Sequence, residues 1–325
     1  MNILVIGAGG FIGSHLVETL VRRGHYVTAL CKYNSSGKYG WLDNSDSIEN
    51  ERLEFALGDV TDTEQVYNLV SNHELTINMS ALIGIPYSYQ APRSYLNINT
   101  LGTLNVLEAT RKFDSRMIQI STSEVYGTPK SVPIRLDHPI NPQSPYSASK
   151  AAADLLVKSY TSSFETKALI VRPFNTFGPR QSMRAVIPTI LNQILSGRGV
   201  VKLGSVDVRR DFTYVDDTVD GIVGAAESAL YDGRVIQLGT GISYSIDQVL
   251  QLCRDAFNCD FEVLFDEKRV RPLASEVEVL QSDPTSAFED LGWKYKIELK
   301  DGLIQTFDWM LEQGINLNIS GRYYV

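Results

Sequence analysis

The sequence predicts an α/β protein with a doubly wound parallel sheet and a smaller α/β substrate-binding domain towards the C-terminus. Two observations carry this prediction. Short apolar runs, typical of strands buried on both faces, alternate with amphipathic helical segments over residues 1–172. The first run, at residues 3–6, leads directly into a glycine-rich turn and a helix. In such a sheet, ligands bind at the carboxyl ends of the strands.

The glycine-rich turn carries Gly7, Gly10 and Gly13 at a Gly-x-x-Gly-x-x-Gly spacing. A turn between a strand and a helix presents backbone N–H groups and a helix N-terminus, which together can bind a pyrophosphate. This position favours a Rossmann-like, dinucleotide-binding domain, although the spacing differs from the commoner Gly-x-Gly-x-x-Gly. Phe11 and Ile12 belong to the same turn and are predicted cofactor contacts.

The second strand, at residues 26–30, is followed by Cys31 and Lys32. A site for NAD usually places Asp or Glu at this point to bind the ribose hydroxyls. Lys32 can instead face the 2′-phosphate of NADP, so the sequence slightly favours NADP and leaves NAD open. The alternative for Lys32 is an ordinary solvated loop lysine.

The remaining strands of the first domain are expected at residues 53–57, 75–79, 116–120 and 168–171. Asp59 and Val60 follow the third strand, where the Asp59 carboxylate can accept a hydrogen bond from an adenine amino group. Ser80 and Ala81 follow the fourth strand and pass the cofactor ribose in folds of this kind.

Helices are expected at residues 14–23, 97–112 and 142–160. Residues 85–89 are expected to form an aromatic loop over the sugar site, with Tyr87 as a substrate contact. The alternative for this segment is a rigid surface loop.

After Pro173 the sequence becomes turn-rich, so residues 173–325 are predicted to form the substrate domain. A segment at about 211–240 is expected to return to the first domain's sheet, because it contains a helix and an apolar strand. Helices are also expected at residues 185–196, within 244–259 and at 299–312, and a loop at residues 269–272.

The bulk composition excludes several classes of function. The net charge of −8 argues against a general nucleic-acid or membrane-surface role. No apolar run reaches about 18 residues, so no membrane-spanning helix is predicted. Three scattered cysteines indicate neither a disulfide framework nor a zinc site, the four histidines show no metal spacing, and a reducing cytoplasm fits best. No metal site is therefore predicted.

The stretch at residues 119–150 holds the strongest candidates for catalysis. Tyr146 and Lys150 are four residues apart, so on a helix they share one face. An adjacent ammonium stabilises a tyrosinate and lowers the tyrosine pKa from about 10. Such a tyrosine can take a proton from a substrate hydroxyl. On its own, the pair could equally be one turn of an amphipathic helix.

Taken together, these motifs resemble the extended short-chain dehydrogenase/reductase family of nucleotide-sugar enzymes over essentially the whole chain. The resemblance adds Asn99, the Arg172–Arg180 run, the Arg210–Asp217 run and Leu291-Gly292-Trp293 to the residues above. It implies that Asn99 contacts the cofactor. It also implies that Asn175 and Arg210 bind a diphosphate, with Arg180 and Arg271 as weaker candidates. Each weaker candidate could instead be a surface ion-pair residue.

Thr122, Ser123 and Glu124 indicate which reaction the resemblance implies. The 4-epimerases of the family need only a small hydroxyl residue with the Tyr/Lys pair, whereas 4,6-dehydratases add an acid and a base at this point. UDP-glucuronate decarboxylases also carry Thr-Ser-Glu. The segments 81–89 and 181–189 are similar to dehydratases that act on nucleotide-linked N-acetylglucosamine on routes to legionaminic-type acids.

The resemblance therefore implies a 4,6-dehydratase acting on UDP- or GDP-linked N-acetylglucosamine, in cell-surface glycan biosynthesis. In this role Tyr146, Lys150 and Thr122 serve the C4 hydroxyl, and Glu124 takes the C5 proton. Ser123 is a poor general acid. A decarboxylase, a 4-epimerase and a non-enzymatic NADP-sensing protein stay open. A homodimer through the helices at 97–112 and 145–160 is an expectation from the family.

Overall fold

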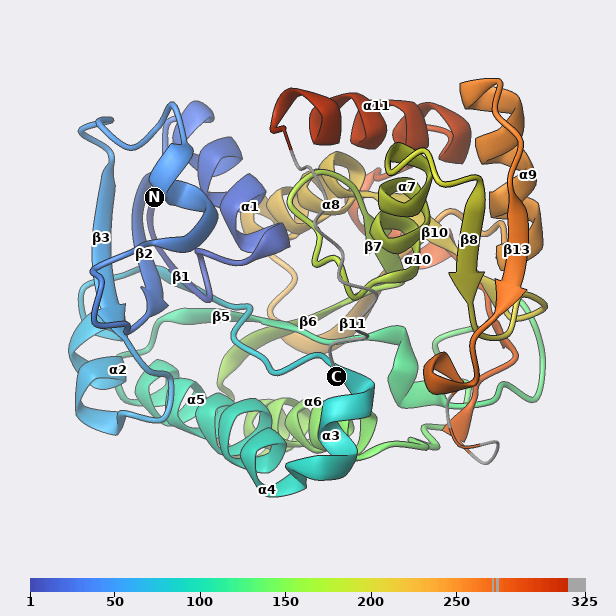
Figure 1. Ribbon diagram of the computed structural model, residues 1–325. Helices are drawn as coiled ribbons and strands as arrows, with labels where there is room; N and C mark the ends of the chain where they lie inside the picture. Colours follow the sequence, from blue (N-terminus) through green and yellow to red (C-terminus); the bar gives the residue numbers. More distant parts are fainter. Residues whose placement is uncertain (271, 273–274, 315–325) are drawn as a thin grey trace.

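The central sheet has seven parallel strands in the order β11-β6-β5-β4-β1-β2-β3 (Figure 1). The computed structural model describes residues 1–270, 272 and 275–314. The doubly wound order, with β1 between β4 and β2, confirms the predicted fold class. The strands are β1 Asn2–Ile6, β2 Tyr26–Lys32, β3 Leu53–Gly58, β4 Leu75–Asn78, β5 Arg116–Ile120, β6 Lys167–Pro173 and β11 Asp232–Leu238.

Alternation along the strands divides the core into two halves. Ile3 and Val5 of β1 lie in one hydrophobic cluster, and Leu4 and Ile6 lie in another. Successive strand side chains point to opposite faces, so a continuously apolar strand supplies both clusters. The sheet therefore needs a helical layer on each side.

The two layers are formed by helices that come from both halves of the sequence. Helices α1 (Phe11–Arg22) and α8 (Val215–Glu227) contribute to the first cluster and pack against each other. Helices α2 (Thr63–Val70), α5 (Gly102–Lys112) and α6 (Pro145–Phe164) contribute to the second. Figure 1 shows α1 and α8 above the sheet and α2, α5 and α6 below it.

Two segments differ from the expectation. Residues 85–89, expected as a loop, form most of helix α3 (Ile85–Gln90), with Pro86 in the first turn and Ser88 Oγ donating to Ile85 O. The helix expected at 97–112 starts earlier, because α4 (Pro92–Tyr95) and a π-helical turn, η2 (Leu96–Leu101), run continuously into α5. The aromatic residues 85–89 therefore lie on a helix and not in a loop.

The second half of the chain builds three small sheets beside the large one. They pair β7 (Asn175–Phe177) with β10 (Phe212–Tyr214), β8 (Val200–Leu203) with β13 (Glu262–Phe265), and β9 (Arg209–Arg210) with both β12 (Tyr244–Ser245) and β14 (Val279–Leu280). Helices α7 (Val186–Leu195), α9 (Ile246–Phe257), α10 (Thr285–Leu291) and α11 (Leu299–Glu312) surround them. The short 3₁₀ turns are η1 (Gly40–Asn44), η3 (Ser123–Tyr126) and η4 (Glu267–Arg269).

Part of this second half returns to the large sheet. After α8, strand β11 pairs in parallel with β6 at the sheet edge. Ile187 of α7 and Val249 of α9 share a hydrophobic cluster with Leu16 of α1. The domain boundaries at 172 and 173 stay a prediction, because one continuous core joins the two parts.

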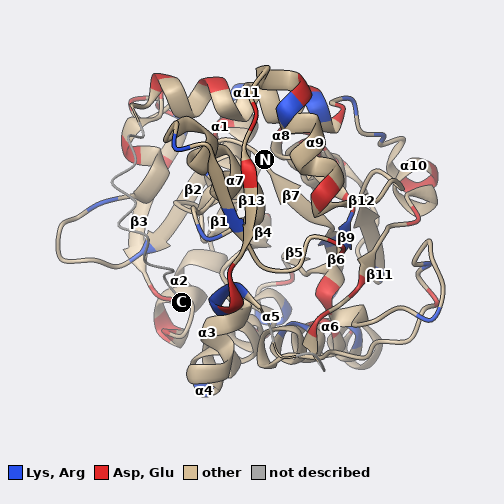
Figure 2. Ribbon diagram, turned by 45° about the vertical axis from the view of Figure 1, so that its right-hand side comes forward, with Lys and Arg blue, Asp and Glu red and all other residues tan. Residues whose placement is uncertain are grey.

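Charged side chains of both signs are interspersed over the outer helices and loops (Figure 2). Among the described residues, none of the helices has both the length and the apolar character needed to cross a bilayer.

Candidate functional site

Tyr146 lies in the first turn of α6, whose start is fixed by a capping box. Ser144 Oγ accepts a hydrogen bond from Ser147 N at 3.1 Å, and Ser144 N donates to Ser147 Oγ at 3.0 Å. Pro145 occupies the first helical position, where its missing N–H costs nothing. This local geometry holds the Tyr146 ring at the C-terminal edge of β5, with 8% of the residue exposed.

The predicted catalytic residues after β5 converge on Tyr146. The Thr122 side chain hydrogen-bonds the Tyr146 hydroxyl, and Thr122 Oγ1 also accepts from Glu124 N at 3.3 Å. Glu124 is half-buried in η3, and its charge acts on Tyr146. Ser123 is buried at 3% exposure. A hydroxyl donor, a carboxylate and a phenol therefore meet at one place.

The pKa of Tyr146 shifts in the direction opposite to that expected from the Tyr146–Lys150 spacing. Burial raises the pKa of Tyr146 well above its ordinary value, the Thr122 hydrogen bond partly offsets this, and the charge of Glu124 raises it further. The Lys150 ammonium donates to Ile120 O at 2.5 Å. Burial lowers the pKa of Lys150 to about 8. The protein alone therefore keeps the phenol protonated.

The glycine turn has the shape that a dinucleotide site needs. Gly7 has a φ of +86°, and a Cβ on Gly13 would lie 2.4 Å from Gly7 O. Gly10 is the N-cap of α1. It has no side chain to accept a hydrogen bond, so the first N–H groups of the helix have no side-chain cap. These features fit a pyrophosphate at the helix N-terminus.

Gly9, the additional glycine, has a separate structural cause. A Cβ on Gly9 would lie 2.4 Å from Tyr39 O, and a Cβ on Gly40 would lie 2.4 Å from Gly9 O. Trp41 N donates to Gly9 O at 3.1 Å. The loop after β2 thus packs directly on the glycine turn, which explains why both positions are glycine.

Four of the other predicted cofactor residues follow strands β3 and β4, and Asn99 is the exception. Ser80 and Ala81 are half-buried after β4. Asp59 Oδ1 accepts from Thr61 N at 2.9 Å and from Thr61 Oγ1 at 2.8 Å, while Val60 is buried. These four residues lie just beyond the carboxyl ends of β3 and β4.

Asn99 is the exception, because its side chain is fully buried and engaged. Its Oδ1 accepts from Leu82 N at 2.8 Å, and its Nδ2 donates to Leu82 O at 3.0 Å and to Ser149 Oγ at 2.9 Å. Asn99 therefore ties the loop after β4 to α6. Asn99 lies on the π-helical turn η2 and contributes to the site by holding these two elements in place.

At the end of β2, the side chain of Asn34 organises the loop that follows Lys32. Asn34 Nδ2 donates to Lys32 O at 3.1 Å and to Lys38 O at 2.7 Å. Asn34 Oδ1 accepts from Lys38 N at 3.0 Å. The main chains of two exposed lysines are therefore held together at the strand end, where the sequence lacks a carboxylate.

The predicted substrate residues separate into two groups. Asn175 in β7 and the buried Arg210 in β9 flank Asp211, whose carbonyl oxygen accepts from Asn175 N at 3.0 Å. Arg210 forms an ion pair with Glu276 at 3.2 Å. Arg180 instead pairs with Glu18 of α1 at 2.9 Å.

Tyr87 and Arg271 complete the predicted set. Tyr87 lies on α3 with 40% of its surface exposed, and its ring contacts Tyr95, which in turn contacts the Tyr146 ring edge-on at 6.2 Å. Arg271 lies outside the described residues. A chain of aromatic rings thus leads from the surface to Tyr146.

Sequence reasoning missed a buried polar network beneath Lys150. Asp154 Oδ2 accepts from Ser121 Oγ and from Arg172 Nη2, each at 2.6 Å. Arg172 Nη1 donates to Tyr126 Oη at 2.6 Å. Asp154 follows Lys150 by four residues, which is the spacing that places Lys150 after Tyr146. That repetition was the signal available in the sequence.

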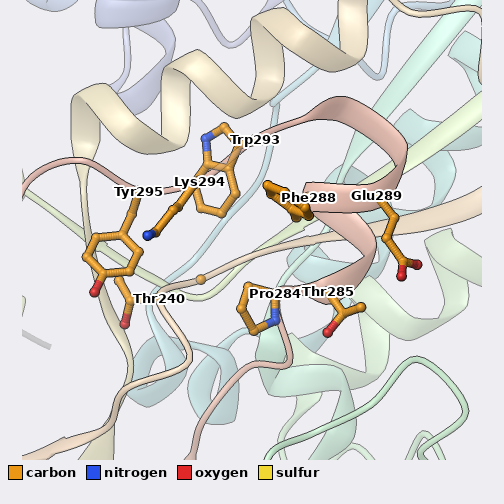
Figure 3. A pocket seen from close by; sticks show the side chains of 9 residues that line it. Thr240, Pro284, Thr285, Phe288, Glu289, Trp293, Lys294 and Tyr295 are labelled. Carbon is orange, nitrogen blue, oxygen red and sulfur yellow. The ribbon is translucent and has the colours of Figure 1, made fainter.

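A cavity lies against α10, apart from the Asp154 network (Figure 3). Its volume is about 360 Å³, and its lining includes Thr240, Phe288, Trp293 and Tyr295. None of the predicted catalytic or cofactor residues lines it. Within residues 1–270, 272 and 275–314, no group of three or more His, Cys, Asp or Glu side chains is arranged to hold a metal ion.

Comparison with known proteins extends these observations. The family model described as GDP-mannose 4,6 dehydratase matches residues 4–306. The chain is 31% identical over 314 residues to a putative UDP-glucose 4-epimerase of Methanocaldococcus jannaschii, covering 95% of this chain and 98% of the relative. It is 30% identical over 315 residues to a dTDP-glucose 4,6-dehydratase of Mycolicibacterium smegmatis, covering 95% and 93%.

The fold is also similar to a crystal structure of a UDP-glucuronic acid 4-epimerase from Bacillus cereus, in complex with UDP-glucuronic acid and NAD. The TM-score is 0.88 at 27% identity, covering 96% of this chain and 100% of that chain. Relatives of comparable similarity thus include epimerases and a dehydratase.

Proposed function

Because the chain belongs to the family of NAD-dependent epimerases and dehydratases represented by GDP-mannose 4,6-dehydratase, we propose that it is a nucleotide-sugar 4,6-dehydratase. The proposed substrate is UDP- or GDP-linked N-acetylglucosamine, and the product is the 4-keto-6-deoxy sugar. The enzyme class is therefore a hydro-lyase.

The observation that carries this proposal is the position of Glu124. Its charge acts on Tyr146, and its backbone N–H is held by Thr122 Oγ1. A 4-epimerase acts on C4 alone, whereas elimination of water also requires a base for the C5 proton. A half-buried carboxylate beside the phenol supports the second reaction.

The chain's residues have defined roles in this proposal. Tyr146 Oη takes the proton of the C4 hydroxyl, and the Thr122 hydroxyl orients both oxygens. The Lys150 ammonium stabilises the tyrosinate that accepts this proton. The new C4 ketone makes the C5 proton acidic, and Glu124 removes it.

The departing C6 hydroxyl needs a proton to leave as water. Ser123 is a poor general acid and is buried, so Glu124, directly or through a water, passes on the proton that it took from C5. A proton from solvent then returns to C5, and Tyr146 releases to solvent the proton that it took from the C4 hydroxyl, which restores the starting state. A bound nicotinamide supplies hydride acceptance from C4 and hydride return to C6.

The proposed cofactor is NADP, held at the glycine turn. Gly7, Gly10, Phe11, Ile12 and Gly13 would contact its pyrophosphate. Lys32, with Lys38 brought to it by Asn34, would contact the 2′-phosphate. The Bacillus cereus structure contains NAD, so NAD is the competing cofactor.

The proposed diphosphate contacts are Asn175 and Arg210. A guanidinium suits a phosphate because it offers two parallel donors. Asn175 Oδ1 is buried and has no hydrogen-bond partner among the described residues, which supports a polar ligand at this point. Arg180 and Arg271 are weaker candidates, and Tyr87 would cover the sugar.

Replacement of Glu124 by Gln tests the proposal. Glu124→Gln should slow the loss of water from the nucleotide sugar by roughly 10²- to 10⁴-fold, because an amide cannot take the C5 proton. Binding of dinucleotide, measured by calorimetry, should be unchanged.

The exposed Glu64→Gln on α2 is the matched control and should retain full turnover. Unchanged turnover in Glu124→Gln would exclude Glu124 as the base. Loss of dinucleotide binding in that variant would instead indicate that Glu124 has a structural role.

A further inference from the structure

Helix α6 presents three polar side chains to the site at four-residue intervals. Tyr146, Lys150 and Asp154 share one helical face, and 8%, 2% and 0% of their surfaces are exposed. The proposed function uses the first two. The third is an ionisable group in the core, and such groups are rarely buried without a partner or a role.

The two oxygens of Asp154 differ in their contacts. Oδ2 accepts short hydrogen bonds from Ser121 Oγ and Arg172 Nη2. Oδ1 is buried and has no hydrogen-bond partner among the described residues. A buried carboxylate oxygen without a donor is costly unless a positive charge lies nearby.

Arg172 supplies one such charge, through its ion pair with Oδ2 at 2.6 Å, and Lys150, four residues earlier on the same helical face, supplies a second. Among the described residues the Lys150 ammonium makes one hydrogen bond, to Ile120 O, although it carries three donors. Burial disfavours the cationic form of Lys150, and the charge of Asp154 opposes this effect. Tyr95 of α4, Glu124 and Tyr126 of η3, Tyr146 of α6 and Arg172 of β6 are the other titratable groups that surround the network.

We propose that Asp154, held in place by Arg172, is a buried counter-ion of Lys150 and keeps it cationic beside Tyr146. Asp154 is a positioning residue, because it acts through Lys150. Arg172 stays charged at any working pH and pairs with Asp154 at 2.6 Å. The inference rests on the proposed function in one respect, because that function gives the Lys150 ammonium the role of stabilising the Tyr146 tyrosinate.

The charges predict a definite direction of change. Asp154→Asn removes the negative charge and also leaves the Arg172 guanidinium uncompensated beside Lys150. Both effects disfavour the ammonium, so the pKa of Lys150 should fall by about 1 to 3 units from its value of about 8. Ser121→Ala acts in the opposite direction, because one donor is withdrawn from Asp154 and its charge acts more strongly on Lys150.

The titration of Lys150 can be measured directly by NMR on protein labelled at lysine Cε and Nζ. Lys150→Arg assigns the signal. The expected result is a lower Lys150 pKa in Asp154→Asn and a raised one in Ser121→Ala. No turnover is needed, so failure of the dehydratase proposal and failure of this inference are distinguishable.

A folded Asp154→Asn with an unchanged or raised Lys150 pKa would overturn the inference. If Asp154→Asn does not fold, Ser121→Ala decides the question, since it changes no charge. An unchanged or lowered Lys150 pKa in that variant would overturn the inference equally.

Discussion

Among single residues, Lys32 has the clearest consequence for cofactor choice. It ends β2, and Asn34 ties its carbonyl to that of Lys38. Both side chains are exposed and free to turn towards a phosphate. A 2′-phosphate would gain charge-assisted hydrogen bonds there, whereas a ribose hydroxyl would find no carboxylate.

Lys32→Ala should weaken NADPH binding about tenfold or more, the value of one hydrogen bond to a charged group. NADH binding should be unchanged, because that cofactor lacks the 2′-phosphate. Fluorescence titration with both cofactors measures the difference, and Lys130→Ala, in an exposed loop, is the control. Tighter binding of NADH than of NADPH by the unaltered chain would refute the NADP proposal.

Sequence spacing predicted Tyr146 and Lys150, and the family resemblance added Thr122 and Glu124. Local geometry on one helix and one strand end brings these four residues together. Spacing gave the wrong sign for the pKa of Tyr146. The sign depends on burial, and burial is set by α4 and η3, which approach from elsewhere in the sequence. Asp154 was missed for a related reason, since its partner Arg172 lies on β6.

Among the elements, the glycine turn between β1 and α1 carries strict geometric demands. A Cβ on Gly13 would meet the oxygens of Gly7 at 2.4 Å and of Ala8 at 2.9 Å. A Cβ on Gly10 would meet only Gly7 O, at 3.3 Å. One glycine is therefore required by the fold, and the other leaves space at the helix N-terminus.

Two alanine substitutions separate these roles. Gly13→Ala should lower the free energy of unfolding by about 1–3 kcal/mol, because backbone must move to admit the methyl group. Gly10→Ala should cost about 1 kcal/mol or less, yet weaken dinucleotide binding at least about tenfold by blocking the pyrophosphate. Urea unfolding and calorimetry measure the two effects, and equal loss of stability in both variants would contradict the assignment.

Most elements followed from apolar periodicity, including α11 at Leu299–Glu312 with the expected bounds. The exceptions are segments in which tertiary contacts override local pattern. Residues 85–90 became helical where Tyr95 Oη donates to Gly84 O and Asn99 holds Leu82. The π-helical turn η2 has no signature in periodicity, because it inserts a residue into an otherwise regular helix.

At the scale of the whole molecule, the strand order places the dinucleotide turn and the catalytic stretch at one edge of the sheet. β1 and β5 both flank β4, so their carboxyl ends are neighbours. The alternation of strands and helices predicted this edge. It could not predict the three small sheets, which are built from strands of two to four residues.

The homodimer expected through α5 and α6 stays a prediction. Leu101 of the adjoining turn η2 and Leu155 and Phe164 of α6 are about half exposed, at 50%, 58% and 47%. Such apolar exposure is compatible with a partner surface.

The central claim is that the chain removes water from a nucleotide sugar, and mass spectrometry of the product tests it most directly. Incubation with UDP- or GDP-N-acetylglucosamine in deuterium oxide should yield a product that has lost one water. That product should carry solvent deuterium at C5, because the proton that returns to C5 comes from solvent. A 4-epimer of unchanged mass, or release of CO2 from UDP-glucuronate without water loss from any nucleotide hexose, would contradict the claim.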